Sequence, residues 1–200
     1  MSAALREEAA LPNPMIGPHT LEEWLDLPPS EDGSRTELIF GHLLVTPPPS
    51  GEHQLTAYWL GRWIDDTIRA AGRSDLFFAP PVGVKISSTL RTALIPDAAI
   101  LDRKPTGTSF PAEALLLAVE VWSPGNTRSE RLAKLTAYAA AGVPFAWTIA
   151  QTSKASGLRL TAHRLKGGEY QAENVVDTGG PTTITAAPLP VTVDLDELGF

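Results

Sequence analysis

Apolar residues recur at helical spacing over residues 51–72. Leu60, Ile64 and Ile68 follow one another four positions apart, so they lie on one side of a helix. Gly72 follows this stripe, and glycine is common just past a helix end because it readily adopts left-handed backbone angles. The pattern therefore predicts an amphipathic helix over this stretch.

Two further helices are predicted. Residues 123–142 begin as a loop and continue as a helix, for which the pattern places Leu132, Leu135 and Ala139 on the buried side. Residues 20–27 begin with the spacing of a capping box and end before a proline, which predicts a short helix.

Strands are predicted where short apolar runs are bounded by turn residues. Residues 30–47 are expected to form a hairpin around the sequence FGH. Residues 113–122 are apolar on both alternating sides, which is typical of a central strand covered on both faces. Further strands are expected at residues 76–86, 94–102, 143–150, 157–165 and 169–176, and a strand with one helical turn at residues 189–200.

The order of these elements is helix, hairpin, helix, strands, helix, strands. It predicts an α/β or α+β fold built on one mixed central β-sheet flanked by helices, with extra β-strands at the C-terminus. Residues 1–18 are rich in Ala, Glu and Pro and are expected to be a flexible N-terminal arm. Residues 19–200 are expected to form a single domain.

Composition narrows the class of protein. The chain of 200 residues is 43% hydrophobic and 20% charged, as in ordinary globular proteins. Its apolar runs are much shorter than the roughly 20 residues that cross a bilayer. It begins without the features of a secretory signal, and it has no cysteines, which excludes disulfides and thiol chemistry. We therefore expect a cytoplasmic protein that does not bind a membrane.

The net charge of −7 restricts how the chain could bind nucleic acid. A protein that coats nucleic acid neutralises phosphates with a broad surface of Lys and Arg, which this composition disfavours. The charge remains compatible with an enzyme whose acidic site takes nucleic acid with the help of divalent cations.

Two carboxylates lie in segments that are otherwise apolar. Asp97 is the sole charged residue of LIPDAAIL, and Glu120 is the sole charged residue of LLLAVEVW. An isolated buried carboxylate costs several kcal/mol, so such groups are usually paired, hydrogen-bonded or metal-bound. If the two strands are neighbours, Asp97, Glu120 and the backbone carbonyl of Val121 form an oxygen-only site suited to Mg²⁺ or Mn²⁺.

A lysine follows at a spacing that could bring it to the same place. Glu130 and Lys134 are four residues apart on the helix after the Glu120 strand, and Tyr138 is four further on. A helix that starts just beyond this strand could turn Lys134 back toward the acids. There, its ammonium would stabilise developing negative charge or orient a water molecule.

These motifs together resemble a known family. Asp97 in PD, followed by Glu120, is similar to the PD-(D/E)XK signature of the restriction-endonuclease-like nuclease superfamily. The segments TLEEWLDLP, ELIFGHLLVTPPPSGEHQ, LIPDAAILD, LLLAVEVWSPGNTRSERLAKLTAYAAAGVPFAWTIA and LRLTAHRLKGGEY resemble, in the same order, the Uma-two (Uma2) family of "putative restriction endonucleases". The resemblance runs from about residue 20 to residue 170.

The resemblance implies a restriction-endonuclease-like core and a divalent-metal-dependent endonuclease that hydrolyses DNA phosphodiester bonds. It implies that Asp97 and Glu120 bind Mg²⁺ or Mn²⁺. Position 122, where the wider superfamily has its lysine, is Trp122, and this branch resembles a variant in which Lys134 on the following helix takes that role. By analogy with nucleases that cut both strands, a homodimer is expected.

Three other positions match polar positions of the family. Glu37 and His53 could complete the site, or they could be a solvated hairpin residue and a helix residue near solvent. Glu130 stands where the family has an acid before the helix lysine, usually an aspartate. Ala150 stands where the family has an acid at a strand end.

Each main residue also has a purely structural interpretation. Asp97 could be a strand-end carboxylate bonded to backbone amides, and Glu120 could be half of a buried ion pair. Glu130 and Lys134 have the spacing and orientation of a surface helical ion pair.

A second functional hypothesis is a catalytically inactive scaffold or binding module that keeps the nuclease fold. The acidic charge balance, Trp122 and Ala150 favour it. A third, a metalloprotein acting on a small phosphorylated substrate, fits the charge balance but has no motif of its own.

Overall fold

The computed structural model of the protein describes residues 17–151 and 157–198. Of the expected flexible arm at residues 1–18, all but the last two residues lie outside these ranges. The described helices are α1 (Leu21–Leu25), α2 (Gly51–Ala70) and α3 (Arg128–Ala140), with the short 3₁₀ helices η1 (Ala112–Ala114) and η2 (Leu195–Leu198).

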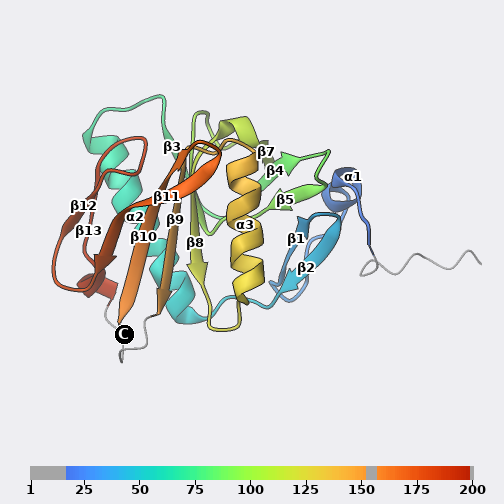
Figure 1. Ribbon diagram of the computed structural model, residues 1–200, viewed down its shortest axis with the longest axis horizontal. Helices are drawn as coiled ribbons and strands as arrows, with labels where there is room; N and C mark the ends of the chain where they lie inside the picture. Colours follow the sequence, from blue (N-terminus) through green and yellow to red (C-terminus); the bar gives the residue numbers. More distant parts are fainter. Residues whose placement is uncertain (1–16, 152–156, 199–200) are drawn as a thin grey trace, which may run out of the picture.

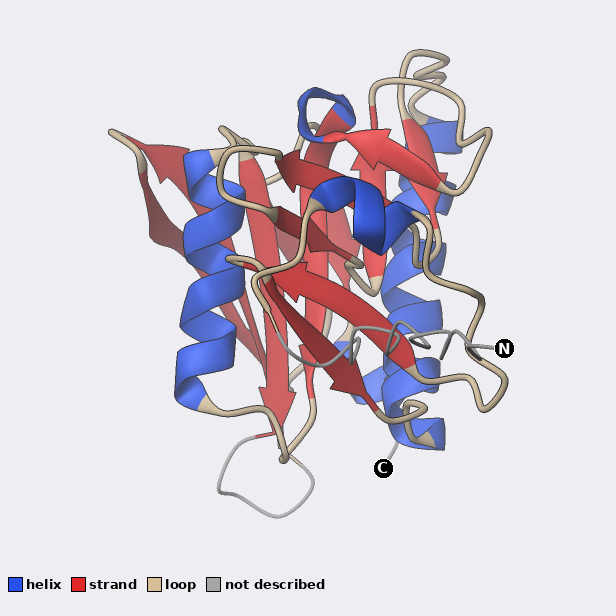
Figure 2. Ribbon diagram, turned by 90° about the vertical axis from the view of Figure 1, so that its right-hand side faces the viewer, coloured by secondary structure: helices blue, strands red, loops and turns tan. Residues whose placement is uncertain are grey.

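A six-stranded mixed sheet forms the centre of the molecule, in the order β11-β10-β9-β8-β6-β3. Strands β8 and β9 pair in parallel, and the other neighbours are antiparallel. Helix α3 covers one face of this sheet and α2 covers the other (Figures 1 and 2). The strands are β3 (Phe77–Ala79), β6 (Ala98–Leu101), β8 (Leu115–Trp122), β9 (Phe145–Gln151), β10 (Leu158–Lys166) and β11 (Glu169–Asp177).

A second sheet of five strands lies beside the central one, in the order β2-β1-β5-β4-β7. Its strands are β1 (Arg35–Ile39), β2 (His42–Thr46), β4 (Gly83–Ser87), β5 (Thr92–Leu94) and β7 (Ser109–Pro111). The C-terminal strands β12 (Thr182–Ile184) and β13 (Val191–Val193) form a separate hairpin. The predicted mixed central sheet with extra C-terminal strands is confirmed, but the second sheet of five strands was not predicted.

Prolines explain why the strands divide between two sheets. The predicted strand at residues 76–86 is split by Pro80 and Pro81 into β3 and β4. The predicted strand at residues 94–102 is split by Pro96 into β5 and β6. Proline has no backbone N–H for a strand ladder, so each segment leaves one sheet at its prolines and enters the other.

The predicted hairpin at residues 30–47 is confirmed as the antiparallel pair β1–β2. Its two turn residues, Phe40 and Gly41, have φ angles of +50° and +82°. Positive φ at both central residues is the backbone of a tight hairpin turn whose twist matches that of its strands. The hairpin holds β1 against β5, the strand that leads into Pro96.

Strand β8 is buried on both faces, as predicted. Leu117, Val119 and Val121 belong to the core shared with α2, whereas Ala118 belongs to the core shared with α3. Successive side chains of a strand point to opposite faces, so Glu120 faces the same side as Ala118. The strand therefore turns its one carboxylate toward α3.

The buried side of α3 differs from the prediction. Lys134, Ala137 and Tyr138 are its buried residues, whereas Leu132 is 63% exposed. The hydrophobic pattern misplaced this face because two of its buried residues carry polar groups that bind a buried carboxylate, as described below. Burial of these groups outweighs burial of one leucine, since an unpaired carboxylate inside the protein costs more.

The two longer helices begin and end as their sequences predict. Gly72 and Gly142 follow the last residues of α2 and α3 with φ angles of +63° and +77°.

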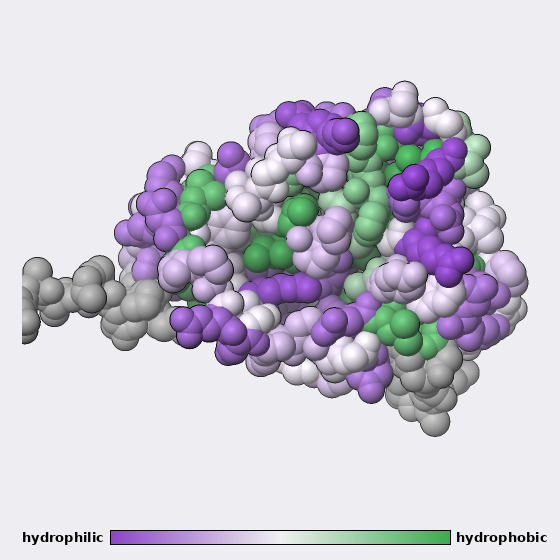
Figure 3. Space-filling view, turned by 180° about the vertical axis from the view of Figure 1, so that it is seen from behind, coloured by the Kyte–Doolittle hydropathy of each residue, from purple (hydrophilic) through white to green (hydrophobic). Residues whose placement is uncertain are grey.

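Among the described residues no helix is both long and apolar enough to cross a membrane. The face that carries α2 is hollowed near its middle (Figure 3).

Candidate functional site

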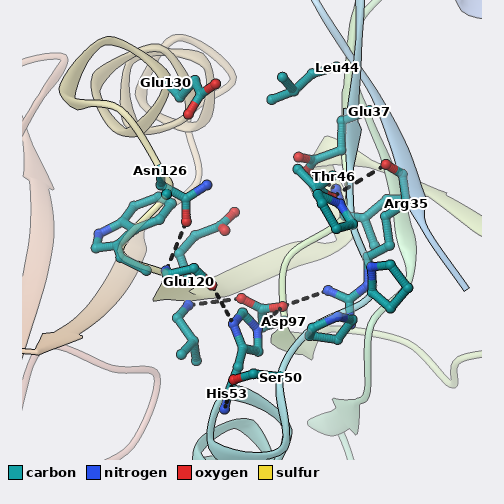
Figure 4. A pocket seen from close by; sticks show the side chains of 18 of the residues that line it. Arg35, Glu37, Leu44, Thr46, Ser50, His53, Asp97, Glu120, Asn126 and Glu130 are labelled. Atoms are coloured by element: carbon teal, nitrogen blue, oxygen red, sulfur yellow. Dashed lines mark hydrogen bonds and ion pairs between the residues drawn. The ribbon is translucent and has the colours of Figure 1, made fainter.

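A pocket of about 530 Å³ opens where the two sheets meet α2 and α3. Asp97 enters it from the residue before β6, Glu120 from β8, Glu37 from β1 and His53 from the first turn of α2 (Figure 4). Lys134 of α3 also lines it. We call this cavity the carboxylate pocket, after Asp97, Glu120 and Glu37. The predicted site residues are thus brought together from five separate elements.

Asp97 is 5% exposed and is bound on both of its oxygens. Its Oδ2 accepts a hydrogen bond from the Val121 N–H at 2.8 Å. Its Oδ1 accepts one from Arg35 Nη1 at 2.6 Å and lies 2.9 Å from His53 Nε2. Burial alone would raise the pKa of Asp97, but His53, the Val121 amide and Arg35 outweigh it and lower the pKa. The carboxylate is therefore ionised.

Glu120 is 3% exposed and is bound by two groups of α3. Lys134 Nζ lies 3.0 Å from Oε2, and the Tyr138 hydroxyl donates to Oε1 at 2.8 Å. Burial raises the pKa of Glu120 to about 8, against the opposing attraction of Lys134, and the charges of Glu37 and Asp97 raise it further. The pKa of the Tyr138 hydroxyl is raised by its burial and by Glu120, so this group donates as a neutral phenol.

Lys134 joins two of the acids. Its ammonium is 2.8 Å from Glu37 Oε2 and 3.0 Å from Glu120 Oε2, and its side chain is 10% exposed. Burial would lower the pKa of this ammonium, but the two carboxylates together raise it. Lys134 Nζ also lies 6.0 Å from the centre of the Trp122 ring. The helix lysine thus occupies the space beside position 122.

Glu37 is buried, at 2% exposure, and links β1 to the segment after β5 and to α3. Its Oε1 accepts a hydrogen bond from the Ile95 N–H at 2.7 Å, while Oε2 binds Lys134. The interpretation of Glu37 as a solvated hairpin residue is therefore wrong. The bond to Ile95 fixes the backbone two residues before Asp97.

His53 is also drawn into the pocket. Its side chain is 12% exposed, and Nδ1 lies 3.3 Å from the Ser123 hydroxyl. Ser50 caps α2 by accepting a hydrogen bond from the His53 N–H, which places this residue in the first turn. The imidazole lies between Asp97 and the loop that follows β8.

Glu130 lines the pocket without joining the charged cluster. It forms a capping box with Thr127, whose N–H donates to Glu130 Oε2 at 2.7 Å. The surface pair of Glu130 with Lys134 is not formed, because Lys134 turns inward to Glu37 and Glu120.

Two residues of the site were not assigned to it from the sequence. Arg35 binds Asp97, and Tyr138 binds Glu120. Arg35 and Glu37 are two apart on one strand, so strand alternation would have placed both side chains on the same face. Tyr138 is four residues after Lys134, and helical spacing would have placed its hydroxyl beside the same acid.

The charges of the cluster leave room for a cation. Glu37, Asp97 and Glu120 place three carboxyl groups beside the two cations Arg35 and Lys134, so the negative charges exceed the positive ones by one when Glu120, whose pKa is raised, is ionised. Each carboxylate oxygen has a second lone pair beyond the bond it already accepts. Carboxylate oxygens with an excess of negative charge fit Mg²⁺ or Mn²⁺. Across residues 17–151 and 157–198, no three His, Cys, Asp or Glu residues are arranged as a metal site by themselves, so a backbone carbonyl or water would have to complete it.

The raised pKa of Glu120 predicts how one substitution changes stability with pH. The folded-state pKa of about 8 exceeds the ordinary 4.5, so the folded chain holds this proton more tightly and loses stability as pH rises between these values. Gln cannot titrate. Glu120→Gln should therefore gain stability relative to the wild type between pH 5 and pH 8.5, as measured by urea unfolding. A difference that stays constant with pH would show that Glu120 is ionised throughout.

Comparison with known proteins is consistent with this architecture. A family model described as "Putative restriction endonuclease" (Uma2) matches residues 21–196. The structure is similar to a "putative nuclease belonging to DUF820" from Anabaena variabilis, with a TM-score of 0.65 and 16% identity over 90% of this chain and 97% of that one. This likeness confirms the predicted nuclease fold. A search of curated proteins found no match.

Proposed function

Because the chain belongs to the Uma2 family of "putative restriction endonucleases", we propose that it is a divalent-metal-dependent endonuclease that hydrolyses DNA phosphodiester bonds at the carboxylate pocket. The observation that carries this proposal is the convergence of Asp97, Glu120 and Lys134, from three separate elements, on one pocket.

The acids that would hold the cation are Asp97 and Glu120, with the backbone carbonyl of Val121. Their neighbours favour this role, since the Val121 N–H fixes Asp97 and Tyr138 fixes Glu120. A bound Mg²⁺ or Mn²⁺ lowers the pKa of water and polarises a phosphate. Partners that orient metal ligands typically change metal affinity or activity by about 10- to 100-fold when removed.

The cationic side chains would act on the phosphate itself. Lys134 can donate to a phosphate oxygen or to the attacking water while it keeps one carboxylate partner. Arg35, 26% exposed, reaches the pocket from β1 and can bind a second phosphate oxygen. Donors fixed in place before the reaction stabilise the negative charge that develops on the phosphate.

Calorimetric titration of Mn²⁺ tests the metal site. The wild type should bind Mn²⁺, and the double variant Asp97→Ala plus Glu120→Gln should not, because it lacks both carboxylates. Asp75→Asn removes an exposed carboxylate, 63% accessible and bound by Arg73, and should bind Mn²⁺ like the wild type. Equal Mn²⁺ affinity in the double variant would refute the proposed ligands.

A catalytically inactive scaffold remains the second candidate, and one observation favours it. All four oxygens of Asp97 and Glu120 already have protein partners, so the pocket is internally satisfied. Supercoiled plasmid, linear duplex and single strands, each with Mg²⁺ or Mn²⁺ at low salt, separate the two. Cleavage of any substrate supports the endonuclease. Mn²⁺ binding with no cleavage of any of them supports the scaffold.

A further inference from the structure

A second hollow, of about 710 Å³, lies on the side of Asp97 that faces α2. The face that carries α2 shows hydrophobic side chains near its middle, surrounded by hydrophilic ones (Figure 3). We call this cavity the α2 hollow. The residues that line it include Gln54, Ala57, Tyr58, Gly61, Arg62 and Phe78.

The α2 hollow adjoins the carboxylate pocket. Arg35, Pro49, His53 and Asp97 line both cavities. A strand with one phosphate beside Asp97 can therefore place an adjoining part of the same nucleotide chain in the hollow without leaving the surface. A group that fills the hollow would therefore be one that is covalently attached near a phosphate of the same chain.

The floor of the hollow is apolar. Phe78 packs against Gly61 so closely that a Cβ at position 61 would lie 2.5 Å from the Phe78 ring. Ala57 continues this small-residue stripe of α2 one turn earlier, and Pro80 and Pro81 add apolar surface. Tyr58 stands at the rim, 61% exposed, although an aromatic of this size is usually much more buried.

The rim also offers the polar groups that base edges need. Gln54 carries an amide, which both donates and accepts hydrogen bonds. Arg62 is 52% exposed and its guanidinium lies 4.9 Å from the centre of the Trp59 ring. Asp65 adds acceptors. An apolar floor, an exposed aromatic and a hydrogen-bonding rim together suit a nucleobase.

The charge of the two cavities favours an unpaired strand over a duplex. Arg35, Arg62 and Lys134 are the Lys and Arg residues that line them, within the described ranges. Duplex binding depends on neutralising many phosphates, which three cations on a chain of net charge −7 do not provide. Binding through base stacking needs fewer phosphate contacts.

We propose that the α2 hollow binds one unpaired base of single-stranded DNA, next to a phosphate bound by Arg35 beside Asp97, and that the protein therefore acts on single-stranded segments. This inference rests on the proposed nuclease function. Tyr58 would stack on the base and Arg62 or Gln54 would contact its edge.

Fluorescence anisotropy with two labelled 12-mers tests it, one of deoxythymidine and one with the same backbone and no bases. Binding is measured at low salt, in EDTA and in Ca²⁺. The wild type should prefer the thymidine strand, and Tyr58→Ala should weaken that binding by roughly five- to a hundredfold. Tyr58→Phe should keep the preference, because the ring remains. Ala57→Leu, which places a larger side chain in the hollow, should abolish it.

Leu132→Ala is the matched control, an exposed residue of α3 that lines neither cavity, and it should bind like the wild type. No preference for bases in the wild type, or a preference unchanged in both Tyr58→Ala and Ala57→Leu, would overturn the inference. If Asp97-dependent cleavage persists in that case, the proposed function stands without it. If Tyr58→Ala and Ala57→Leu lose the preference for bases but the wild type cuts no DNA, the base-binding site is supported and the nuclease proposal fails.

Discussion

Replacing Lys134 with Met is expected to lower the free energy of unfolding by about 3–5 kcal/mol at pH 8.5 and to abolish DNA cleavage. The substitution leaves Glu37 and Glu120 buried without their shared cation, and burial of unpaired charge is the cause of the loss. The loss should shrink at pH 5, where these carboxylates can take up protons instead. Urea unfolding at both pH values measures it.

A compensated variant separates the structural role of Lys134 from its catalytic one. Adding Glu37→Gln and Glu120→Gln to Lys134→Met should restore most of the stability, because no unpaired charge remains, but it should not restore cleavage. Lys104→Met removes an exposed lysine that lines neither of the two cavities and should change neither property. If Lys134→Met alone is as stable as the wild type at both pH values, the buried ion pairs of Lys134 with Glu37 and Glu120 are refuted.

Replacing Asp97 with Asn is expected to lower the initial rate of Mg²⁺-dependent cleavage by at least about a hundredfold while the fold persists. The amide oxygen of Asn can still accept the Val121 N–H, so the link between the segment before β6 and β8 survives. The negative charge that would hold the cation, and that pairs with Arg35, is lost. Cleavage of a labelled oligonucleotide measures the rate.

The matched control for this substitution is Asp75→Asn, which makes the same chemical change at an exposed carboxylate. It should cleave at the wild-type rate. Wild-type cleavage by Asp97→Asn would place the active site elsewhere on the molecule. Loss of cleavage together with loss of the folded state would show that Asp97 serves mainly to join the strands.

The local elements of this fold could be predicted because their signals are short in range. The spacing of Leu60, Ile64 and Ile68 is enough to predict α2, and the apolar run of β8 is enough to predict a covered strand. The division into two sheets could not be predicted. Pro80, Pro81 and Pro96 indicate breaks, but which sheet each half joins depends on pairing with distant segments.

The candidate site could be predicted in part for the same reason. Asp97 and Glu120 are each the single charged residue of an apolar run, and this signal is visible in the sequence itself. The sequence left several kinds of compensation open: a shared cation with Lys134 nearby, backbone amides for Asp97, and a buried ion pair for Glu120. In the structure, Glu120 is bound by Lys134 and Tyr138, and Asp97 by Arg35.

These partners come from β1 and α3, and only the folded chain brings them beside the acids. The same contacts explain why α3 turns away from the face that its leucines predict. Lys134 and Tyr138 must both face the sheet to reach Glu120, and Leu132 is then left in solvent. A hydrophobic stripe is a weaker determinant here than a buried carboxylate that needs partners.

A crystal structure of the protein with Mn²⁺, in which the anomalous signal locates the ion, tests the proposed metal site most directly. We expect one Mn²⁺ bound by Asp97, Glu120 and the carbonyl oxygen of Val121, with Lys134 keeping its contact to Glu37. A carboxylate pocket without Mn²⁺, in crystals where the ion binds exposed carboxylates, would contradict the proposed metal site.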